Sequence, residues 1–154
     1  MKRYAWIAAL VVIADQLVKA YARTLTGPVT LIPHVIGLRY SENTGMAFSM
    51  LSQHTWLLTA LSAALILVGW LALRRYQLGM LSRIAAMLML GGAVGNLIDR
   101  FFVGYVVDMF EPLLFRFAIF NVADSALTVG SVLMAVTLLF FPKDWSLKNG
   151  AAED

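Results

Sequence analysis

Residues 91–124 read GGAVGNLIDRFFVGYVVDMFEPLLFRFAIFNVAD, and this run places carboxylates, amides and a guanidinium inside an otherwise very apolar chain. Ionisable groups at membrane depth are costly, so where they occur they usually face a protein interior or a wet cavity. Asn96, Asp99 and Arg100 follow an i, i+3, i+4 spacing, which puts all three on one face of a helix. The run therefore predicts a membrane helix with one polar face.

A second polar cluster follows in the same run. Asn121 and Asp124 are again three residues apart, and Asp108 lies between the two clusters, next to Val106 and Val107. β-Branched residues favour an extended backbone, so we expect Asp108 on an extended segment and the two clusters to converge. Two carboxylates in a low-dielectric site cannot both ionise cheaply, which makes one a base and the other an acid. We interpret Asp108 and Asp124 as a catalytic pair, although spacing alone leaves a structural role equally open.

The composition indicates an integral membrane protein with one domain, residues 1–154. Hydrophobic residues make up 60% of the chain and charged residues 14%, and the mean hydropathy is +0.77, whereas a soluble domain carries about 25% charged residues. The net charge of +3 is too small to indicate a nucleic-acid partner. The chain has no cysteine and only two histidines, without an HExxH motif. These absences argue against thiolate chemistry and a zinc peptidase, and we expect no metal and no other cofactor.

Four spanning helices are predicted, because about 20 apolar residues cross the hydrocarbon core. Their approximate ranges are 4–23, 55–73, 84–100 and 121–141. Glycine and proline interrupt the segment after the first helix, and residues 28–51 are expected to form a small β-element on the membrane surface. Its strands are predicted at 29–32 and 35–40, with a turn near 43–45. A lid-like loop is expected between helices 3 and 4, and the polar tail after Pro142 is expected to fray. The fold class is thus an all-α membrane protein with a small β-element.

The basic residues predict the topology. With four spans, one side of the membrane receives Lys2, Arg3, Arg74, Arg75, Arg83, Lys143 and Lys148. The positive-inside rule makes that side the cytoplasm, so both termini are expected there. The polar clusters then lie near the extracytoplasmic face.

Further polar residues have two interpretations each. Asp15 and Lys19 are i, i+4 and form either a structural ion pair or part of the site, and a serine–lysine dyad using Lys19 is a further alternative. Asp99 with Arg100 fits an interhelical brace or loop clamp better than a catalyst. Amides in the helices serve as hydrogen-bond donors between helices as readily as in a site, and glycines at 91, 92 and 95 favour close helix packing. The turn at Asn43 could be only a turn, or its amide could hold a substrate backbone.

The chain closely resembles a known family, and the resemblance covers nearly its whole length. The matching motifs are Asp15-Gln16-x-x-Lys19, Asn43-x-Gly45-x-Ala47-Phe48, Gly91-Gly92-Ala93-x-Gly95-Asn96-x-Ile98-Asp99-Arg100, Val106-Val107-Asp108 and Phe120-Asn121-x-Ala123-Asp124. They are similar to motifs of the bacterial lipoprotein signal peptidases, or type II signal peptidases, in the same order and spacing. One departure is the stretch 109–119, which lacks tryptophan and carries the basic residue Arg116.

The resemblance implies a four-span aspartyl endopeptidase of the bacterial inner membrane. Such an enzyme removes the signal peptide of a prolipoprotein just before a diacylglyceryl-modified cysteine. The resemblance implies that Asp108 and Asp124 are the catalytic dyad. It implies substrate-binding or supporting roles for Asp15, Lys19, Asn43, Gly45, Gly92, Asn96, Asp99, Arg100 and Asn121. The implied partners are the prolipoprotein, membrane lipid and cyclic peptide inhibitors such as globomycin, with no nucleic acid, and a monomer is expected.

A small carboxylate-lined membrane transporter or proton-coupled carrier is the alternative from another class. Intramembrane acids and glycine-broken helices also occur in such carriers. That alternative predicts carboxylates near the bilayer midplane and an inverted repeat, and the sequence indicates neither. A structural or chaperone-like membrane subunit is a third interpretation, which leaves the repeated Asn-x-x-Asp pattern unexplained.

Overall fold

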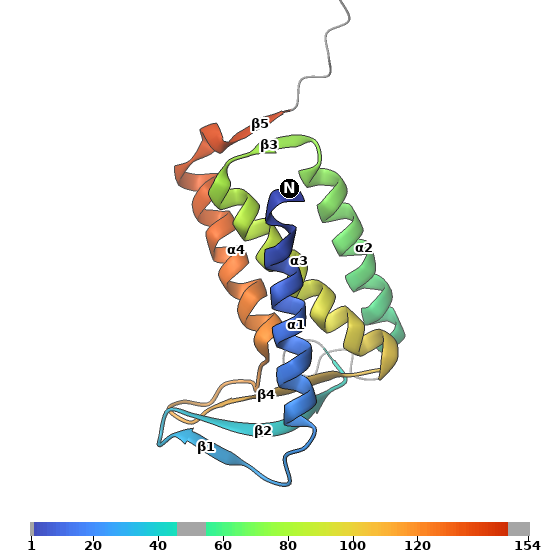
Figure 1. The fold of residues 1–154 in the computed structure, drawn as a ribbon, viewed down its shortest axis with the longest axis vertical. Helices are drawn as coiled ribbons and strands as arrows, with labels where there is room; N and C mark the ends of the chain where they lie inside the picture. Colours follow the sequence, from blue (N-terminus) through green and yellow to red (C-terminus); the bar gives the residue numbers. More distant parts are fainter. Residues whose placement is uncertain (1, 46–54, 148–154) are drawn as a thin grey trace, which may run out of the picture.

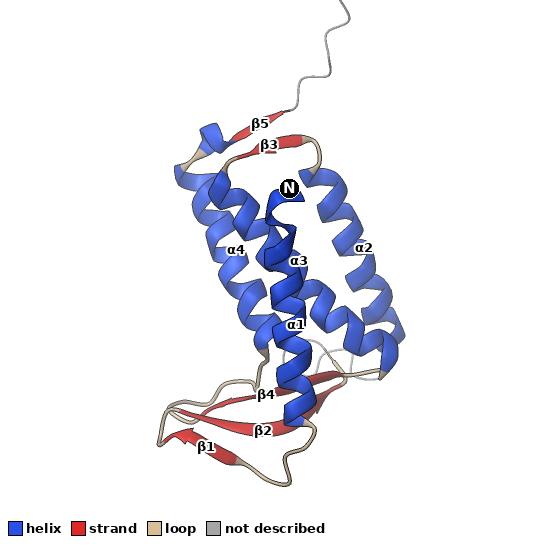
Figure 2. Ribbon diagram, viewed as in Figure 1, coloured by secondary structure: helices blue, strands red, loops and turns tan. Residues whose placement is uncertain are grey.

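The computed structural model describes residues 2–45 and 55–147, and four long helices dominate it (Figures 1 and 2). In chain order the elements are a 3₁₀ turn at Lys2–Tyr4, α1 (Ala5–Ala22), β1 (Val29–Ile32), β2 (Ile36–Asn43), α2 (Thr55–Leu73), β3 (Tyr76–Leu78), α3 (Met80–Phe102), β4 (Val106–Pro112), α4 (Val122–Phe140), a 3₁₀ turn at Pro142–Asp144 and β5 (Trp145–Leu147). The four helices are long and apolar enough to cross a membrane, which confirms the predicted fold class. α3 extends beyond its predicted range at both ends.

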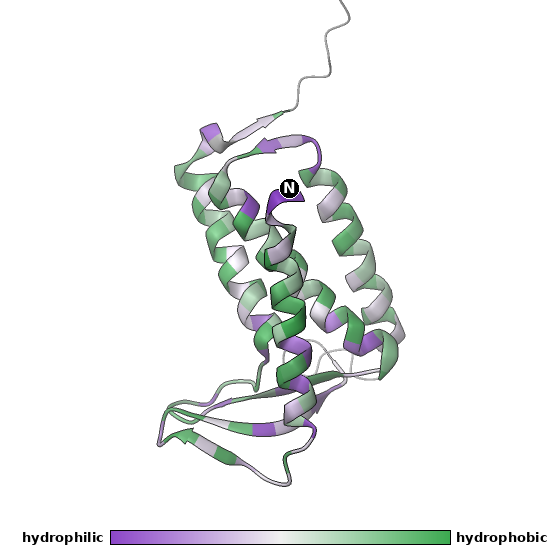
Figure 3. Ribbon diagram, viewed as in Figure 1, coloured by the Kyte–Doolittle hydropathy of each residue, from purple (hydrophilic) through white to green (hydrophobic). Residues whose placement is uncertain are grey.

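The helices run side by side, and their polar positions gather at the ends. Figure 3 shows mostly hydrophobic colours along the helices and hydrophilic colours where they meet the large sheet and at the opposite end. This distribution matches a bundle whose middle lies in hydrocarbon and whose ends reach polar surroundings. The sheet end of the bundle also carries the polar clusters singled out in the sequence.

α3 is the central helix and packs against α1, α2 and α4. Glycines allow these close contacts, as the sequence predicted. A Cβ added at Gly91 would lie 2.8 Å from Val11 Cβ on α1, and one at Gly130 of α4 would lie 2.9 Å from the Ala85 carbonyl oxygen on α3. Small residues at such points let membrane helices approach closely enough for van der Waals packing to hold them together.

Three antiparallel strands form the larger sheet in the order β1-β2-β4. β1 has the predicted bounds, whereas β2 starts at Ile36 and continues to Asn43 because β4 supplies it with a second hydrogen-bonding partner. The predicted turn is present beyond it, since Gly45 N donates to Asn43 Oδ1 at 3.0 Å. Residues 46–51 of the predicted β-element lie outside the described residues. The connection between α3 and α4 therefore begins as a strand, and residues 113–119 form its loop.

A second, two-stranded sheet lies at the opposite end of the bundle, where β3 pairs with β5 (Figure 1). Tyr76 and Trp145 pack edge to face across it, with ring centroids 5.8 Å apart. The sequence predicted a fraying tail here. That prediction is wrong for Trp145–Leu147, because the strand finds a partner in the loop between α2 and α3.

Candidate active site

Asp108 is positioned by the pairing of β2 with β4. Ser41 is opposite Asp108 in the strand register, so Asn43 projects from the same face of the sheet two residues further on. Asn43 Nδ2 donates to Asp108 Oδ2 at 3.0 Å. The carboxyl group is only 2% exposed, so an extended backbone, as predicted, holds a nearly buried acid in one orientation.

Asp124 is positioned by the start of α4. Asn121 is the N-cap: its Oδ1 accepts from Asp124 N at 2.8 Å, and Asp124 Oδ2 accepts from Asn121 N at 3.2 Å. This reciprocal capping box satisfies two of the free N–H groups at the helix start, and the helix dipole favours a carboxylate there. Asn96 Nδ2 of α3 donates to the other oxygen, Asp124 Oδ1, at 2.7 Å.

The amide of Asn121 connects the two aspartates. Its Nδ2 donates to Asp108 Oδ1 at 2.6 Å and also contacts Asn96 Oδ1 at 3.1 Å, while its backbone N–H and side-chain oxygen hold Asp124. Asp108 and Asp124 line one cleft of about 780 Å³ together with Asn43, Asn96 and other residues of β2 and α4. The structure thus brings together the two Asn-x-x-Asp clusters and Asp108, which lie far apart along the chain.

The environment of Asp108 favours its protonated form. Burial raises the pKa of Asp108 to about 6 from a usual value of 3.8, and the nearby charge of Asp124 also raises it. Hydrogen bonds from Asn43 and Asn121 favour the ionised form and lower the pKa, but they do not offset the burial. Burial thus favours a protonated carboxyl group at Asp108, the form that can donate a proton.

A buried lysine lies next to this pair. Lys19 Nζ is 2.7 Å from Asp15 Oδ2, 3.0 Å from Asp99 Oδ2 and 3.0 Å from Asn96 Oδ1. Lys19 and Asp15 are fully buried, and Asp99 is 2% exposed. An ammonium group has three protons, and here each has an acceptor, so the desolvated charge is fully paired.

The ion cluster also holds the backbone on both sides of the site. Asp15 Oδ1 accepts from Ala123 N at 2.9 Å, directly before Asp124, and Asp99 Oδ2 accepts from Val107 N at 3.0 Å, directly before Asp108. Asp15 and Lys19 thus form the ion pair that their spacing predicts. Asp99 joins α1 to β4, but Arg100, which was predicted to act with it as a brace, forms no hydrogen bond or ion pair with this cluster among the described residues. These contacts tie α1 and α3 to the backbone segments that carry Asp124 and Asp108.

Two members of this network, Gln16 and Arg23, were assigned no site role from the sequence, where Gln16 was named only within a motif. Gln16 Nε2 contacts Gly95 O at 3.2 Å and Asp99 Oδ1 at 3.4 Å, and Arg23 Nη2 lies 3.5 Å from the same oxygen. Residues 16, 19 and 23 share one face of α1 by their i, i+3, i+7 spacing. That spacing was the signal that could have identified them.

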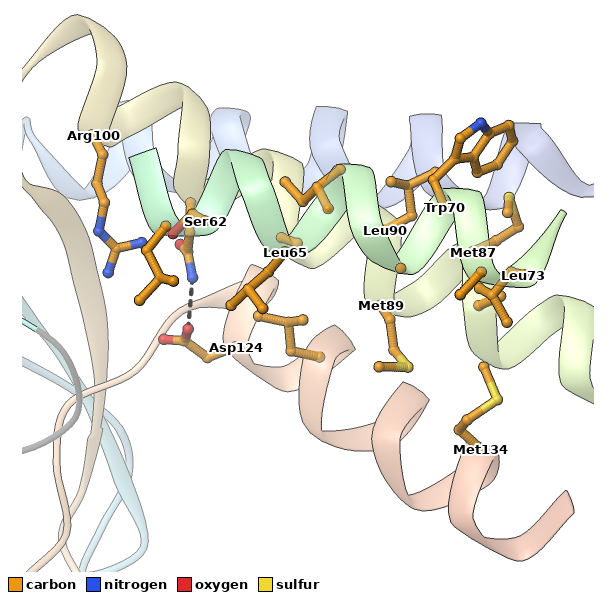
Figure 4. Close-up of a pocket in the computed structure, with 18 of the residues that line it drawn as sticks. Ser62, Leu65, Trp70, Leu73, Met87, Met89, Leu90, Arg100, Asp124 and Met134 are labelled. Atoms are coloured by element: carbon orange, nitrogen blue, oxygen red, sulfur yellow. Dashed lines mark hydrogen bonds between the residues drawn. The ribbon is translucent and has the colours of Figure 1, made fainter. Parts of the chain in front are cut away.

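Arg100 lines the cleft, whereas its neighbour Asp99 does not. Figure 4 shows Arg100 and Asp124 at the same end of an adjoining pocket. Arg100 Nη2 donates to Gly45 O at 3.3 Å, which ties the end of α3 to the turn after β2. The two neighbouring residues therefore differ in role: Asp99 belongs to the buried ion cluster, and Arg100 offers a cation to the cleft beside Asp108 and Asp124.

Glycines bring the helices together behind the aspartates. A Cβ at Gly92 would collide with the Ala123 carbonyl oxygen at the start of α4, and a Cβ at Gly95 would lie 2.7 Å from Asp15 Oδ2. Among residues 2–45 and 55–147, no group of three or more histidines, cysteines, aspartates or glutamates is placed to hold a metal. The chemistry that the described site offers is that of two carboxylates with amide and guanidinium neighbours.

Comparison with protein families gives one match over most of the chain. Residues 7–140 match the model of the family described as signal peptidase (SPase) II. A lipoprotein signal peptidase of Latilactobacillus sakei subsp. sakei (strain 23K) is 38% identical over 147 residues, covering 93% of this chain and 97% of its own. One from Geobacillus kaustophilus (strain HTA426) is 39% identical over 145 residues, covering 90% of this chain and 94% of its own.

Two solved structures share the fold. One bacterial membrane enzyme, determined by the in meso method at 2.3 Å resolution, superposes with a TM-score of 0.86 at 28% identity over 100% of this chain and 94% of its own. A second, determined by the same method at 1.9 Å resolution, has a TM-score of 0.83 at 30% identity over 92% of this chain and 95% of its own. The helices and the sheet described above are therefore similar to those of known membrane enzymes.

Proposed function

This chain belongs to the signal peptidase II family, a family of membrane peptidases that process lipoproteins, and we propose that it acts as an aspartyl endopeptidase. The proposed substrate is a prolipoprotein whose cysteine carries diacylglycerol, and the proposed cleavage site is the peptide bond just before that cysteine. The observation that carries the proposal is the Asn121 amide, which holds Asp108 and Asp124 in one cleft.

In the proposed mechanism, Asp124 is the base and Asp108 the acid. Asp124 takes a proton from a water molecule, whose oxygen attacks the scissile carbonyl carbon, and Asp108 gives its proton to the carbonyl oxygen. The tetrahedral intermediate collapses when the C–N bond breaks: Asp124 passes its proton to the leaving amine, and the hydroxyl proton returns to Asp108. The raised pKa of Asp108, about 6, supports this assignment.

The neighbours of the pair support the same chemistry. The side-chain amides of Asn96, Asn121 and Asn43 donate to three of the four carboxylate oxygens, and the Asn121 backbone N–H donates to the fourth. Little reorganisation is therefore needed as the proton moves. We propose that Arg100, which faces the cleft and binds Gly45 O, orients the substrate backbone or its ester carbonyls. A cyclic peptide inhibitor such as globomycin would occupy the same cleft.

We propose that the site opens near the extracytoplasmic face, with both termini in the cytoplasm. The basic residues on the loops support this orientation by the positive-inside rule. The acyl chains of the substrate would remain in the outer leaflet, so that enzyme and substrate meet within the bilayer. All the proposed catalytic and supporting residues come from one chain, which is consistent with a monomer.

A cleavage assay tests the proposal. Purified protein in bilayers receives a diacylglyceryl-modified prolipoprotein and its unlipidated form, and wild type is compared with Asp108→Asn and Asp124→Asn. Glu111→Gln is a matched control, because Glu111 is also a carboxylate of β4 but forms a half-exposed pair with Arg39. We expect cleavage of the lipidated substrate only, its loss in both Asn variants and its retention in the control.

Two other outcomes would contradict the proposal. Full activity in either Asn variant would remove that aspartate from catalysis and bring Asp99 and Asp15 back as candidates. Wild-type protein that cleaves neither substrate would contradict the peptidase and favour the carboxylate-lined transporter.

A further inference from the structure

An apolar groove leads away from the aspartates along the bundle. It has a volume of about 650 Å³ and lies between α2, α3 and α4 (Figure 4). Asp124 and Arg100 line one end, and Trp70, Leu73 and Met134 lie toward the other. Asn96, Arg100 and Asp124 line both this groove and the cleft at the aspartates, so the two spaces adjoin at these residues.

The groove is as long as a membrane-embedded peptide segment. On α3 its lining residues run from Ala86 to Arg100, a length of about 21 Å at about 1.5 Å per residue. The apolar region of a signal peptide has about 7–15 residues, or roughly 10–22 Å as a helix. An acyl chain anchored in one leaflet has only about half of the ~30 Å hydrocarbon core to itself. The groove, at about 21 Å along α3, is longer than that.

On α2, the groove has unoccupied space beside Gly69. A Cβ at Gly69 would meet nothing within 4 Å, whereas Cβ atoms at Gly91, Gly92, Gly95 and Gly130 would collide with a neighbouring helix. The space beside the Cα of Gly69 is therefore open in the described protein. Ser62 on α2 and Ala86 and Ala93 on α3 also line the groove with small side chains. Small residues of this kind permit close approach of another helix.

Trp145 lines the end of the groove that is far from the aspartates. It belongs to β5, and the pairing of Trp145 with Leu78 of β3 and its edge-to-face contact with Tyr76 hold it in place. Its indole Nε1 is buried and has no hydrogen-bond partner among the described residues. The small sheet thus presents a bulky, fixed side chain where the groove ends.

We propose that this groove binds the apolar segment of the signal peptide as a helix. Gly69 would make the closest contact with this helix, and Trp145 would close the end of the groove that is far from the aspartates. This inference rests on the proposed function and specifies how the substrate is held. The segment joins the scissile bond at the aspartates and runs the length of the bundle from there. Groove length then sets which apolar segments place the scissile bond at Asp108 and Asp124.

Filling the groove tests this arrangement. Gly69→Leu places a side chain in the space that the segment would occupy, and its Cβ would meet no atom of the protein within 4 Å. Ala64→Leu is the matched control, since Ala64 is an exposed residue of the same helix that does not line the groove. We expect Gly69→Leu to raise KM for the prolipoprotein by about tenfold or more with a small change in kcat, and Ala64→Leu to behave as wild type. Thermal unfolding should not shift to lower temperature in Gly69→Leu, because leucine favours a helix more than glycine does. It should shift little in Ala64→Leu, because the helix propensity of leucine is close to that of alanine.

Cross-linking identifies the occupant. The chain has no cysteine, so Gly69→Cys and Ala64→Cys each introduce a single thiol. A prolipoprotein with one free thiol in its apolar segment should form a disulfide with Gly69→Cys and not with Ala64→Cys. A second substrate carries a photoreactive group on its acyl chain, and we expect no labelling of α2 around residue 69.

These experiments distinguish a failure of the groove proposal from a failure of the proposed function. If wild-type protein cleaves the lipidated substrate, but Gly69→Leu is unaffected and the two cysteine variants cross-link equally or not at all, the groove proposal is wrong and the proposed function stands. Acyl labelling around residue 69 would assign the groove to lipid instead. If wild type cleaves no prolipoprotein, the proposed function itself fails.

Discussion

Lys19 Nζ lies 3.0 Å from Asn96 Oδ1 in the interior of the bundle, and the other end of the same amide donates to Asp124 at 2.7 Å. The ammonium of α1 thus fixes which way the Asn96 amide points, and the amide in turn presents N–H to the proposed base. Lys19 reaches the other aspartate through Asp99, which binds Val107 N beside Asp108. Lys19 is in this way connected to both Asp108 and Asp124 through intermediate residues, without a direct hydrogen bond to either.

Lys19→Met should therefore destabilise the protein strongly. The substitution leaves the carboxylates of Asp15 and Asp99 buried without their cation, and removal of one partner from a buried pair costs about 3–5 kcal/mol. Arg39→Met is the control, because Arg39 and Glu111 have side chains 49% and 25% exposed and such pairs contribute about 1 kcal/mol or less. Thermal unfolding in detergent measures both. Equal, small shifts would show that the Lys19 cluster is not a stabilising element.

The pH dependence of cleavage should report Asp108. Since its pKa is about 6, kcat/KM should fall as the pH rises through that value and the acid of the pair loses its proton. The folded-state pKa exceeds the usual 3.8, so the cost of burying the ionised group is present above pH 6. That cost disappears as the pH falls toward 3.8.

Asn43→Ala should shift the pH at which kcat/KM falls to a higher value. The hydrogen bond from Asn43 lowers the Asp108 pKa, so its removal keeps the acid protonated to a higher pH. Tyr40→Phe is the control, because Tyr40 projects from the opposite face of β2 and binds Glu42 and Tyr105. An unchanged or lower value would contradict the contact between Asn43 and Asp108.

Gly92→Ala should separate α3 from α4. The new methyl group would collide with the Ala123 carbonyl oxygen and lie 2.8 Å from Leu127 Cγ, and such overpacking costs about 1–3 kcal/mol. We expect lower thermal stability and slower cleavage, because the start of α4 carries Asp124. Gly69→Ala, where a Cβ meets nothing within 4 Å, should not lose stability. Comparable losses in the two variants would argue against tight α3–α4 contact.

Two substitutions, Asn121→Ser and Asn121→Ala, distinguish the role of Asn121 as the N-cap of α4 from its role in positioning Asp108. Serine keeps an N-cap acceptor for Asp124 N, whereas alanine removes it at a cost of about 1 kcal/mol, and both remove the donor to Asp108. Both should slow cleavage by up to about 100-fold, the loss expected when a catalytic group moves by about an ångström. Only Asn121→Ala should be clearly less stable. Wild-type kcat in Asn121→Ser would show that the amide does not position Asp108.

The amino-acid sequence alone was sufficient to predict the four helices and the residues that share a face of each helix. Apolar runs long enough to cross a bilayer gave α1, α2, α3 and α4 nearly their observed ranges. Helical spacing also predicted the Asp15–Lys19 pair, observed at 2.7 Å. These features depend on neighbours within about one or two helical turns, which is why local periodicity is enough to predict them.

The contacts that these faces make depend on the tertiary structure and could not be predicted from local sequence patterns. The pairing of β4 with β2 places Asn43 against Asp108, and the strand β5 finds its partner in the loop before α3. Packing also decides that Asp99 pairs with Lys19, whereas its neighbour Arg100 lines the cleft and donates to Gly45 O. Strand pairing and interhelical contacts join residues distant in the chain, and the free energy that selects them comes from burial and hydrogen bonds formed only in the assembled fold.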